Sequence, residues 1–290
     1  EEQVKNDLAA ACISRGKRPS VEASMHNAIG YAYVVHTHPT VVNALMCAQD
    51  AQAKVRELFG EQALYIAYTD PGYVLFKKVE NAIAAYRAAN GAEPKVIWLQ
   101  NHGIFVAADS VAEVKAIYAD ITCKLESVLG SVAQPVGGAA SIASELVVPA
   151  LRMLLSSASL KTLKVRSNAL THYFADDAAK RSDVARPFTP DAIVYCKSES
   201  IVLDADTPEA IIAQAQEAIP AYVARRGHAP KVLLVKGVGL VAAGDTAADS
   251  EIILDVFEDA MQTALWTHAF GGPHPMTQAQ IDFIDNWEVE

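Results

Sequence analysis

The chain has 290 residues, of which 51% are apolar, enough to bury the core of one large domain or two ordinary ones. Its 24 basic and 34 acidic residues leave a formal net charge of −10, which argues against a nucleic-acid partner and fits a cytoplasmic protein. No apolar run reaches the roughly 18 residues that a membrane span requires, so no membrane association is predicted.

The chain ends indicate whether residues are missing, and the cysteines indicate the redox compartment of the protein. The chain starts at Glu1, with neither an initiator methionine nor the pattern of a signal peptide, so we expect residues to be missing at both ends. No two cysteines form a C-x-x-C pair, which predicts free thiols in a reducing compartment; they are Cys12, Cys47, Cys123 and Cys196.

The first elements predicted are a helix, a strand and a second helix. A helix opens at Ser20, a good N-cap residue, and carries Glu22 in its first turn. Residues 31–37 (YAYVVHT) are aromatic and β-branched, which predicts a strand. Pro39 suits the first position of a helix that continues to Cys47.

The next segment predicts a helix, two strands and a long helix. Residues 70–72 (DPG) form a turn before a helix over residues 74–89. Residues 95–100 (KVIWLQ) form a buried strand, and a second strand follows over residues 104–107. The last helix is capped by Ser110, and its apolar residues recur with helical spacing.

Two segments of the chain repeat each other. Residues 94–112 (PKVIWLQNHGIFVAADSVA) and 230–248 (PKVLLVKGVGLVAAGDTAA) align without gaps, and most of the positions that differ exchange one apolar residue for another. This predicts an internal duplication of a strand-turn-strand-helix unit. Residues 130–142, rich in glycine and other small residues, are the predicted linker. We therefore expect a metal-binding domain over residues 1–135 and a degenerate repeat over residues 136–290.

Three histidines are candidate metal ligands. His36 and His38 alternate along a predicted strand, so both imidazoles face the same side, although a polar strand edge is the simpler alternative. His102 lies in the turn between two apolar strands, where an imidazole without a partner is costly. The repeat keeps the glycine of this turn but has Val238 in place of His102. Only the first half is therefore expected to bind metal.

A carboxylate completes the candidate site. Glu22 lies upstream on a helix, and three imidazoles with a carboxylate are the parts of a catalytic zinc site with one open position. Taken alone, a first-turn glutamate would only complement the helix dipole. His26 is one helical turn beyond Glu22 and is expected to support the site or to pack in the core. Asn101 is expected to shape the turn and orient His102.

Three motifs in combination resemble the class II aldolase/adducin family. They are P-S-x-E-x-x-x-H at residues 19–26, V-V-H-T-H-P at residues 34–39 and Q-N-H-G-I-F-V at residues 100–106. The second half, with F-T-P-D at residues 188–191, resembles the aldolase region of bifunctional rhamnulose-1-phosphate aldolase/short-chain dehydrogenase proteins. The resemblance implies an α/β fold of the α+β type: a mostly antiparallel sheet with flanking helices, then a degenerate duplicated lobe.

The resemblance also implies an activity. His36, His38 and His102 would bind zinc or another divalent metal, and Glu22 would be the general base. The expected reaction is aldol cleavage of a ketose 1-phosphate, such as rhamnulose 1-phosphate, to dihydroxyacetone phosphate and an aldehyde. A homo-oligomer is expected, and a fused or associated short-chain dehydrogenase domain occurs in such relatives. The alternatives are an epimerase or a decarboxylase on the same metal site, or a non-catalytic adducin-like interaction module.

The chain departs from the family pattern in two places. Family aldolases hold the substrate phosphate with glycine- and serine-rich turns before the glutamate helix, and this chain begins too late to contain them. A small basic loop with Arg15, Lys17 and Arg18 is expected to be solvated surface, an anion site being the alternative. The interval from Glu22 to His36 is shorter than in the simple aldolases, which favours the bifunctional branch.

Overall fold

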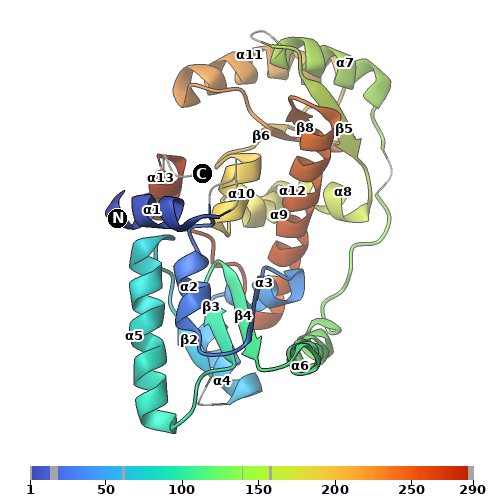
Figure 1. The fold of residues 1–290 in the computed structure, drawn as a ribbon. Helices are drawn as coiled ribbons and strands as arrows, with labels where there is room; N and C mark the ends of the chain where they lie inside the picture. Colours follow the sequence, from blue (N-terminus) through green and yellow to red (C-terminus); the bar gives the residue numbers. More distant parts are fainter. Residues whose placement is uncertain (1, 14–18, 61–62, 139, 157–158, 287–290) are drawn as a thin grey trace. The chain divides into compact units, whose positions relative to one another are not determined.

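The computed structural model describes residues 2–13, 19–60, 63–138, 140–156 and 159–286 (Figure 1). They form two compact units. Unit 1 lies within Glu1–Met46 and Asp50–Leu129, and unit 2 within Cys47–Gln49 and Gly130–Glu290. The predicted basic loop at residues 15–18 lies outside the described residues.

Unit 1 is built on a four-stranded sheet in its described part, with the order β1-β4-β3-β2. Strands β1 and β3 both pair antiparallel with β4, and β2 pairs parallel with β3, so the sheet is mostly antiparallel as predicted. The elements of this unit are α1 (Glu2–Ala11), α2 (Ala23–Ala28), β1 (Tyr33–Thr37), α3 (Thr40–Met46), α4 (Ala51–Phe59), β2 (Leu64–Ile66), α5 (Tyr73–Asn90), β3 (Val96–Leu99), β4 (Gly103–Ala108) and α6 (Val111–Leu129).

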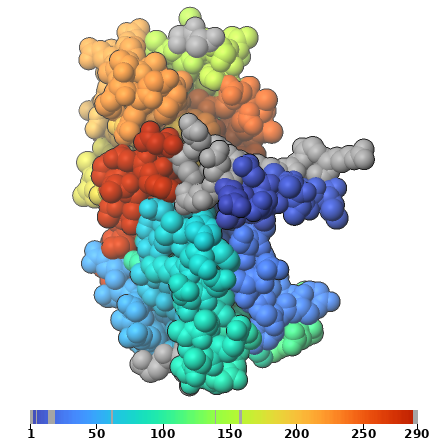
Figure 2. Space-filling view, turned by 60° about the vertical axis from the view of Figure 1, so that its left-hand side comes forward, coloured from blue at the N-terminus to red at the C-terminus, as the bar shows by residue number. Residues whose placement is uncertain are grey.

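Helices cover both faces of this sheet because alternate strand residues point to opposite sides. On one face, Leu99 and Phe105 pack with Met25 of α2 and Val79 of α5. Helices α2 and α5 lie beside each other there, and the outward side of α5 forms a continuous teal strip of surface (Figures 1 and 2). On the other face, α3 and α6 pack against β4. The core of unit 1 is therefore split into two layers by the sheet.

Unit 2 repeats this plan. Its described strands form a sheet of order β5-β8-β7-β6, again with two antiparallel pairings and one parallel pairing. The elements are α7 (Ser144–Leu155), β5 (Thr162–Arg166), α8 (Ala169–Ala175), α9 (Ala178–Arg181), η1 (Ser182–Val184), α10 (Pro190–Cys196), β6 (Ile201–Leu203), α11 (Pro208–Arg226), β7 (Val232–Val235), β8 (Gly239–Gly244), α12 (Ala247–Thr267), η2 (His268–Phe270) and α13 (Gln278–Asp285).

The duplication predicted from the sequence is confirmed by strand register. In unit 1, Val96 lies opposite Val106 and Leu99 opposite Gly103. In unit 2, the residues 136 positions later are paired in the same way, Val232 with Ala242 and Val235 with Gly239. Each pair of strands is followed by a long helix, α6 or α12. The mixed α/β class with a duplicated lobe is therefore correct.

Some predicted boundaries are wrong by a few residues. Helix α2 begins at Ala23, not at Ser20, because the Ser20 hydroxyl accepts the backbone N–H of Glu22 (3.2 Å) within a turn that precedes the helix. Glu22 thus occupies the N-cap position rather than the first turn. The described residues between α6 and α7 carry neither helix nor strand, and the boundary predicted after residue 135 falls among them. No helix in the described part of the chain has the length and apolarity to cross a bilayer.

Candidate metal centre

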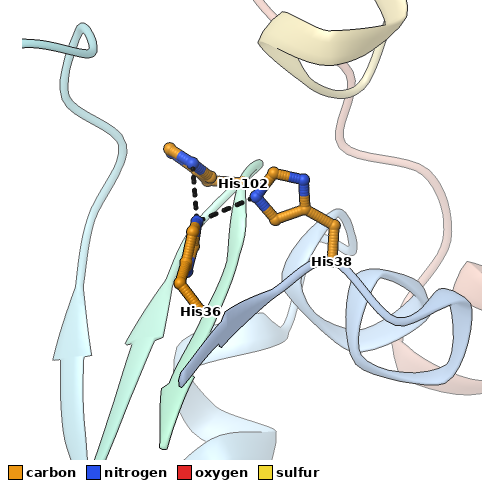
Figure 3. A group of neighbouring side chains, drawn as sticks. All are labelled: His36, His38 and His102. Carbon is orange, nitrogen blue, oxygen red and sulfur yellow. Dashed lines mark hydrogen bonds between the residues drawn. The ribbon is translucent and has the colours of Figure 1, made fainter. Parts of the chain in front are cut away.

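The pairing of β1 with β4 brings the three histidines together. His36 is the fourth residue of β1 and lies opposite Phe105 of β4, and His38 directly follows the strand. Because the two strands are antiparallel, the end of β1 lies beside the turn that precedes β4, and His102 is in that turn. Figure 3 shows the three rings converging from these two segments.

The imidazole nitrogens that face each other are all Nε2 atoms. His36 Nε2 lies 2.9 Å from His38 Nε2 and 3.3 Å from His102 Nε2. One ligand atom from each histidine lies within 4.8 Å of the others, and among the described residues this is the group that could hold a metal ion. His102 is buried, whereas His36 and His38 are partly exposed.

The Glu22 carboxylate lies against the same nitrogens. Its Oε1 atom is 3.0 Å from His102 Nε2 and 3.4 Å from His36 Nε2. Burial would raise the pKa of Glu22, but the close approach of the His102 and His36 imidazoles outweighs it and holds the pKa well below its ordinary value. Burial lowers the pKa of His102, against the opposing attraction of Glu22. The carboxyl is therefore ionised at neutral pH.

Contacts with Ile104 and Phe105 fix the orientation of the His36 ring. Its Nδ1 atom lies 2.9 Å from the backbone carbonyl oxygen of Ile104; a carbonyl can only accept, so Nδ1 carries the proton. The ring also stacks on Phe105, with centroids 4.1 Å apart and planes 19° apart. The Nε2 lone pair is thereby left pointing into the cluster, the arrangement found for histidines that bind metals.

The donor set fits a divalent cation. With His36 protonated at Nδ1, its Nε2 atom is a pure acceptor, yet two ring nitrogens and a carboxylate oxygen approach it. A divalent cation accepts lone pairs from imidazole nitrogens and a carboxylate oxygen gathered in this way. Nitrogen ligands about 2.0–2.1 Å from a tetrahedral zinc ion are about 3.3 Å from each other, close to the separations seen here. The residues present therefore fit a metal of the zinc type.

The turn that carries His102 depends on its two neighbours. Asn101 adopts a left-handed conformation (φ 53°), which asparagine tolerates better than most residues, and is buried. At Gly103, a Cβ atom would lie 2.4 Å from His38 Cδ2 and 2.6 Å from the carbonyl oxygen of Thr37. Only glycine allows this close approach. Asn101 thus occupies a left-handed position of the turn, and its orienting effect on His102 stays a prediction.

His26, the remaining predicted site residue, lies outside the metal-binding group, and Phe105 was not predicted to take part in the site. His26, on α2, contacts Phe105 edge-on (centroids 5.2 Å apart) and lies 6.5 Å from the His36 ring, outside the metal-binding group. Phe105 was not singled out from the sequence. Strand alternation places it on the Ala107 face, but its stacking on His36 depends on the register of β1 against β4.

Two protein-family models match the chain, and one solved structure is similar to part of it. The family model described as "Class II Aldolase and Adducin N-terminal domain" matches residues 1–125, and the model "Aldolase class II, second domain" matches residues 141–290. A solved N-terminal class II aldolase domain of a conserved Thermoplasma acidophilum protein is 21% identical, over 43% of this chain and 56% of that one, with a TM-score of 0.37.

A curated relative is also similar. It is the "Uncharacterized oxidoreductase YuxG" of Bacillus subtilis (strain 168), 21% identical over 98% of this chain and 45% of the relative. The chain thus spans less than half the length of that relative. Since the second-domain model alone matches more than half of the residues and the N-terminal model precedes it in order, this chain belongs to the class II aldolase/adducin family.

Proposed function

We propose that this chain is a zinc-dependent aldolase that cleaves a ketose 1-phosphate, such as rhamnulose 1-phosphate, to dihydroxyacetone phosphate and an aldehyde. The observation that carries the proposal is the convergence of three imidazole nitrogens and one ionised carboxylate at the end of β1. The proposal includes the resemblance-based expectations of a homo-oligomer in the cytoplasm and of a metal-binding domain over residues 1–135.

The three histidines have the role of metal ligands in this proposal. His36, His38 and His102 would hold the cation through their Nε2 atoms. When bound, a divalent cation polarises the carbonyl and neighbouring hydroxyl oxygens of a ketose and so stabilises negative charge that develops beside the carbonyl. The Nδ1–H bond from His36 to Ile104 and the stacking on Phe105 keep one ligand in place before metal and substrate arrive.

Glu22 has the role of the general base. Aldol cleavage breaks the bond between C3 and C4 of the ketose; the C4 hydroxyl loses its proton, and C3 must gain one. Glu22 is suited to exchange the proton at C3 because its carboxyl is ionised, buried on one side and within 3.4 Å of two of the ligand nitrogens. His26 and Asn101 would support this site without touching the substrate.

The proposal is tested by metal analysis and turnover together. The purified chain should retain about one zinc ion, and it should release dihydroxyacetone phosphate from one member of a panel of ketose 1-phosphates. Chelation should abolish turnover, and added Zn²⁺ should restore it. Glu22→Gln should keep the metal and lose turnover.

Other outcomes separate the alternative functions. Isomerised sugar phosphate without aldehyde release would indicate an epimerase, and carbon dioxide release from an acid substrate a decarboxylase. A metal-free chain that turns over no member of the panel would contradict the proposal and favour a non-catalytic adducin-like module.

A further inference from the structure

Unit 2 contains a continuous chain of hydrogen bonds from a serine through a histidine to an aspartate. Ser167 Oγ lies 2.8 Å from His172 Nε2, and His172 Nδ1 lies 3.0 Å from Asp176 Oδ2. An ionised carboxylate can only accept, so Nδ1 donates its proton to Asp176 and Nε2 is left to accept the hydroxyl proton of Ser167. These are the distances and the tautomer of a serine nucleophile paired with its base.

Local sequence places the three side chains. Ser167 directly follows β5, and Asn168 caps α8 by accepting the backbone N–H of Thr171 (3.0 Å). His172 and Asp176 are four residues apart, so they lie above one another on the same side of the helix end. Asp176 is held in turn by the backbone N–H of Gly237, 2.8 Å from its Oδ1 atom.

The imidazole is shielded, whereas the serine residue is exposed. His172 is only 3% exposed, and Gly138 packs on it so closely that a Cβ there would lie 2.8 Å from His172 Cβ. Ser167 is exposed, as a nucleophile must be to meet a substrate. A buried base beside an exposed serine distinguishes this trio from a hydrogen bond between two surface side chains.

One member of the trio, Ser167, occupies the place that His38 occupies in unit 1. Each edge strand is followed by the same turn into a short helix, and His36 and Val165 lie opposite the equivalent strand residues Phe105 and Val241. By this register, Ser167 stands where unit 1 has His38. The duplicated strand end thus presents a hydroxyl in place of an imidazole.

We propose that Ser167, His172 and Asp176 form a metal-independent acyl-transfer site that hydrolyses small activated esters. Ser167 Oγ forms a bond to the ester carbonyl carbon while its proton passes to His172 Nε2, and the carbon–alkoxide bond breaks with that proton leaving on the alcohol. Water then attacks the acyl-serine, giving one proton to His172 and through it to Oγ, and the carboxylic acid departs. Asp176 positions His172 and holds its Nδ1–H bond throughout.

The substrate class follows from what surrounds the hydroxyl. The N–H of Asn168, next to Ser167, already bonds Thr171 Oγ1 (3.0 Å), so it is not free to stabilise an oxyanion. Loss of one such donor costs on the order of 10²- to 10³-fold in rate. Esters with good leaving groups, which need less help, are therefore the expected substrates, and amides are not.

The test uses the full chain stripped of metal by chelation, a 4-nitrophenyl acetate assay and a fluorophosphonate probe mapped by peptide mass spectrometry. We expect the probe on Ser167, with ester hydrolysis above the buffer rate. Ser167→Ala should abolish both, and His172→Gln should lower both at least about 100-fold. Ser182→Ala is the matched control, because Ser182 Oγ bonds only the carbonyl of Ala179 among described atoms and should leave both readouts unchanged.

Two results would overturn the proposal. One is a folded wild-type chain that is not labelled at Ser167; this result does not depend on whether the His172 variant folds. The other is labelling or hydrolysis that disappears on chelation, which would assign it to the metal centre. Aldolase turnover is measured separately, so its absence would leave this test unaffected.

Discussion

The two units of the chain share a backbone plan but differ in the side chains at the same strand end. Both sheets have the edge strand, the central hairpin and the parallel strand in the same order and register. Where unit 1 has His36, His38 and His102, the equivalent positions of unit 2 hold Val165, Ser167 and Val238.

What the two units keep in common is what the backbone needs. A Cβ at Gly103 would lie 2.6 Å from the carbonyl oxygen of Thr37, and one at Gly239 would lie 2.6 Å from that of Arg166. Asn101 and its counterpart Gly237 are both left-handed, at φ 53° and 69°. Because unit 2 folds the same turn without any of the three imidazoles, the imidazoles of unit 1 are not required by the fold. Their convergence therefore indicates a functional role rather than a structural one.

The largest effect is expected when His102 of unit 1 is replaced by valine, the residue at the equivalent position of unit 2. His102→Val copies Val238, which occupies the same turn, so the fold should survive while one metal ligand is lost. Aldolase turnover should fall at least ~10³-fold, since the Lewis acid contributes several kcal/mol. Metal content and turnover are measured on one preparation, with circular dichroism as the check on folding. If the variant kept both zinc and activity, the proposed role of His102 as a metal ligand would be wrong.

Removing the charge of Glu22 should have the next largest effect. Glu22→Gln keeps the size of the side chain but not its basicity, and turnover should fall about 10²- to 10⁴-fold with zinc retained. Glu57→Gln is the matched control, since Glu57 is exposed and pairs only with Lys54 among described residues. Equal activity of the two variants would exclude Glu22 as the base.

Substitutions at the two equivalent turn glycines should separate effects on stability from effects on metal binding. Gly103→Ala and Gly239→Ala each force a methyl group against a strand carbonyl and should cost roughly 1–3 kcal/mol of unfolding free energy. Gly239→Ala should cost about 1–2 kcal/mol more, because its φ of +111° is strained for alanine. Only Gly103→Ala should also weaken zinc binding, through His38. Denaturant unfolding and metal titration test both; equal metal affinity in the two variants would contradict this account.

The smallest effect is expected at Asn101. Asn101→Gly and Asn101→Ala both remove the side-chain amide, but only alanine keeps a Cβ atom, which is strained at a left-handed position. The glycine variant, which copies Gly237, should be about 1 kcal/mol more stable than the alanine variant. Thermal unfolding measures this difference. The opposite order would mean that the two turns are not equivalent.

The sequence predicted the parts of the fold that rest on local pattern. The repeat at a shift of 136 residues was visible because Pro94, Gly103 and Asp109 recur together with the apolar pattern of two buried strands. It located β3, β4 and α6 and their counterparts. The N-cap of helix α2 was predicted at Ser20, two residues before its position at Glu22, because a serine before a helix can also close a turn ahead of it, as Ser20 does.

The sequence could not predict what depends on strand register across the sheet. Residues 33–37 (YVVHT) and 162–166 (TLKVR) are identical at no equivalent position, so the match of Ser167 with His38 appears only in the pairing of β5 with β8. The convergence of His36, His38 and His102 was expected and is seen, but their binding of metal remains a prediction.

The most direct test of the central claim is anomalous diffraction at the zinc edge from crystals grown with Zn²⁺. We predict one strong peak per chain, about 2.0–2.1 Å from the Nε2 atoms of His36, His38 and His102, and none at Val165, Ser167 and Val238 in unit 2. A zinc-containing crystal without a peak at the three histidines, or with the ion bound elsewhere while their nitrogens still bond each other, would contradict the account.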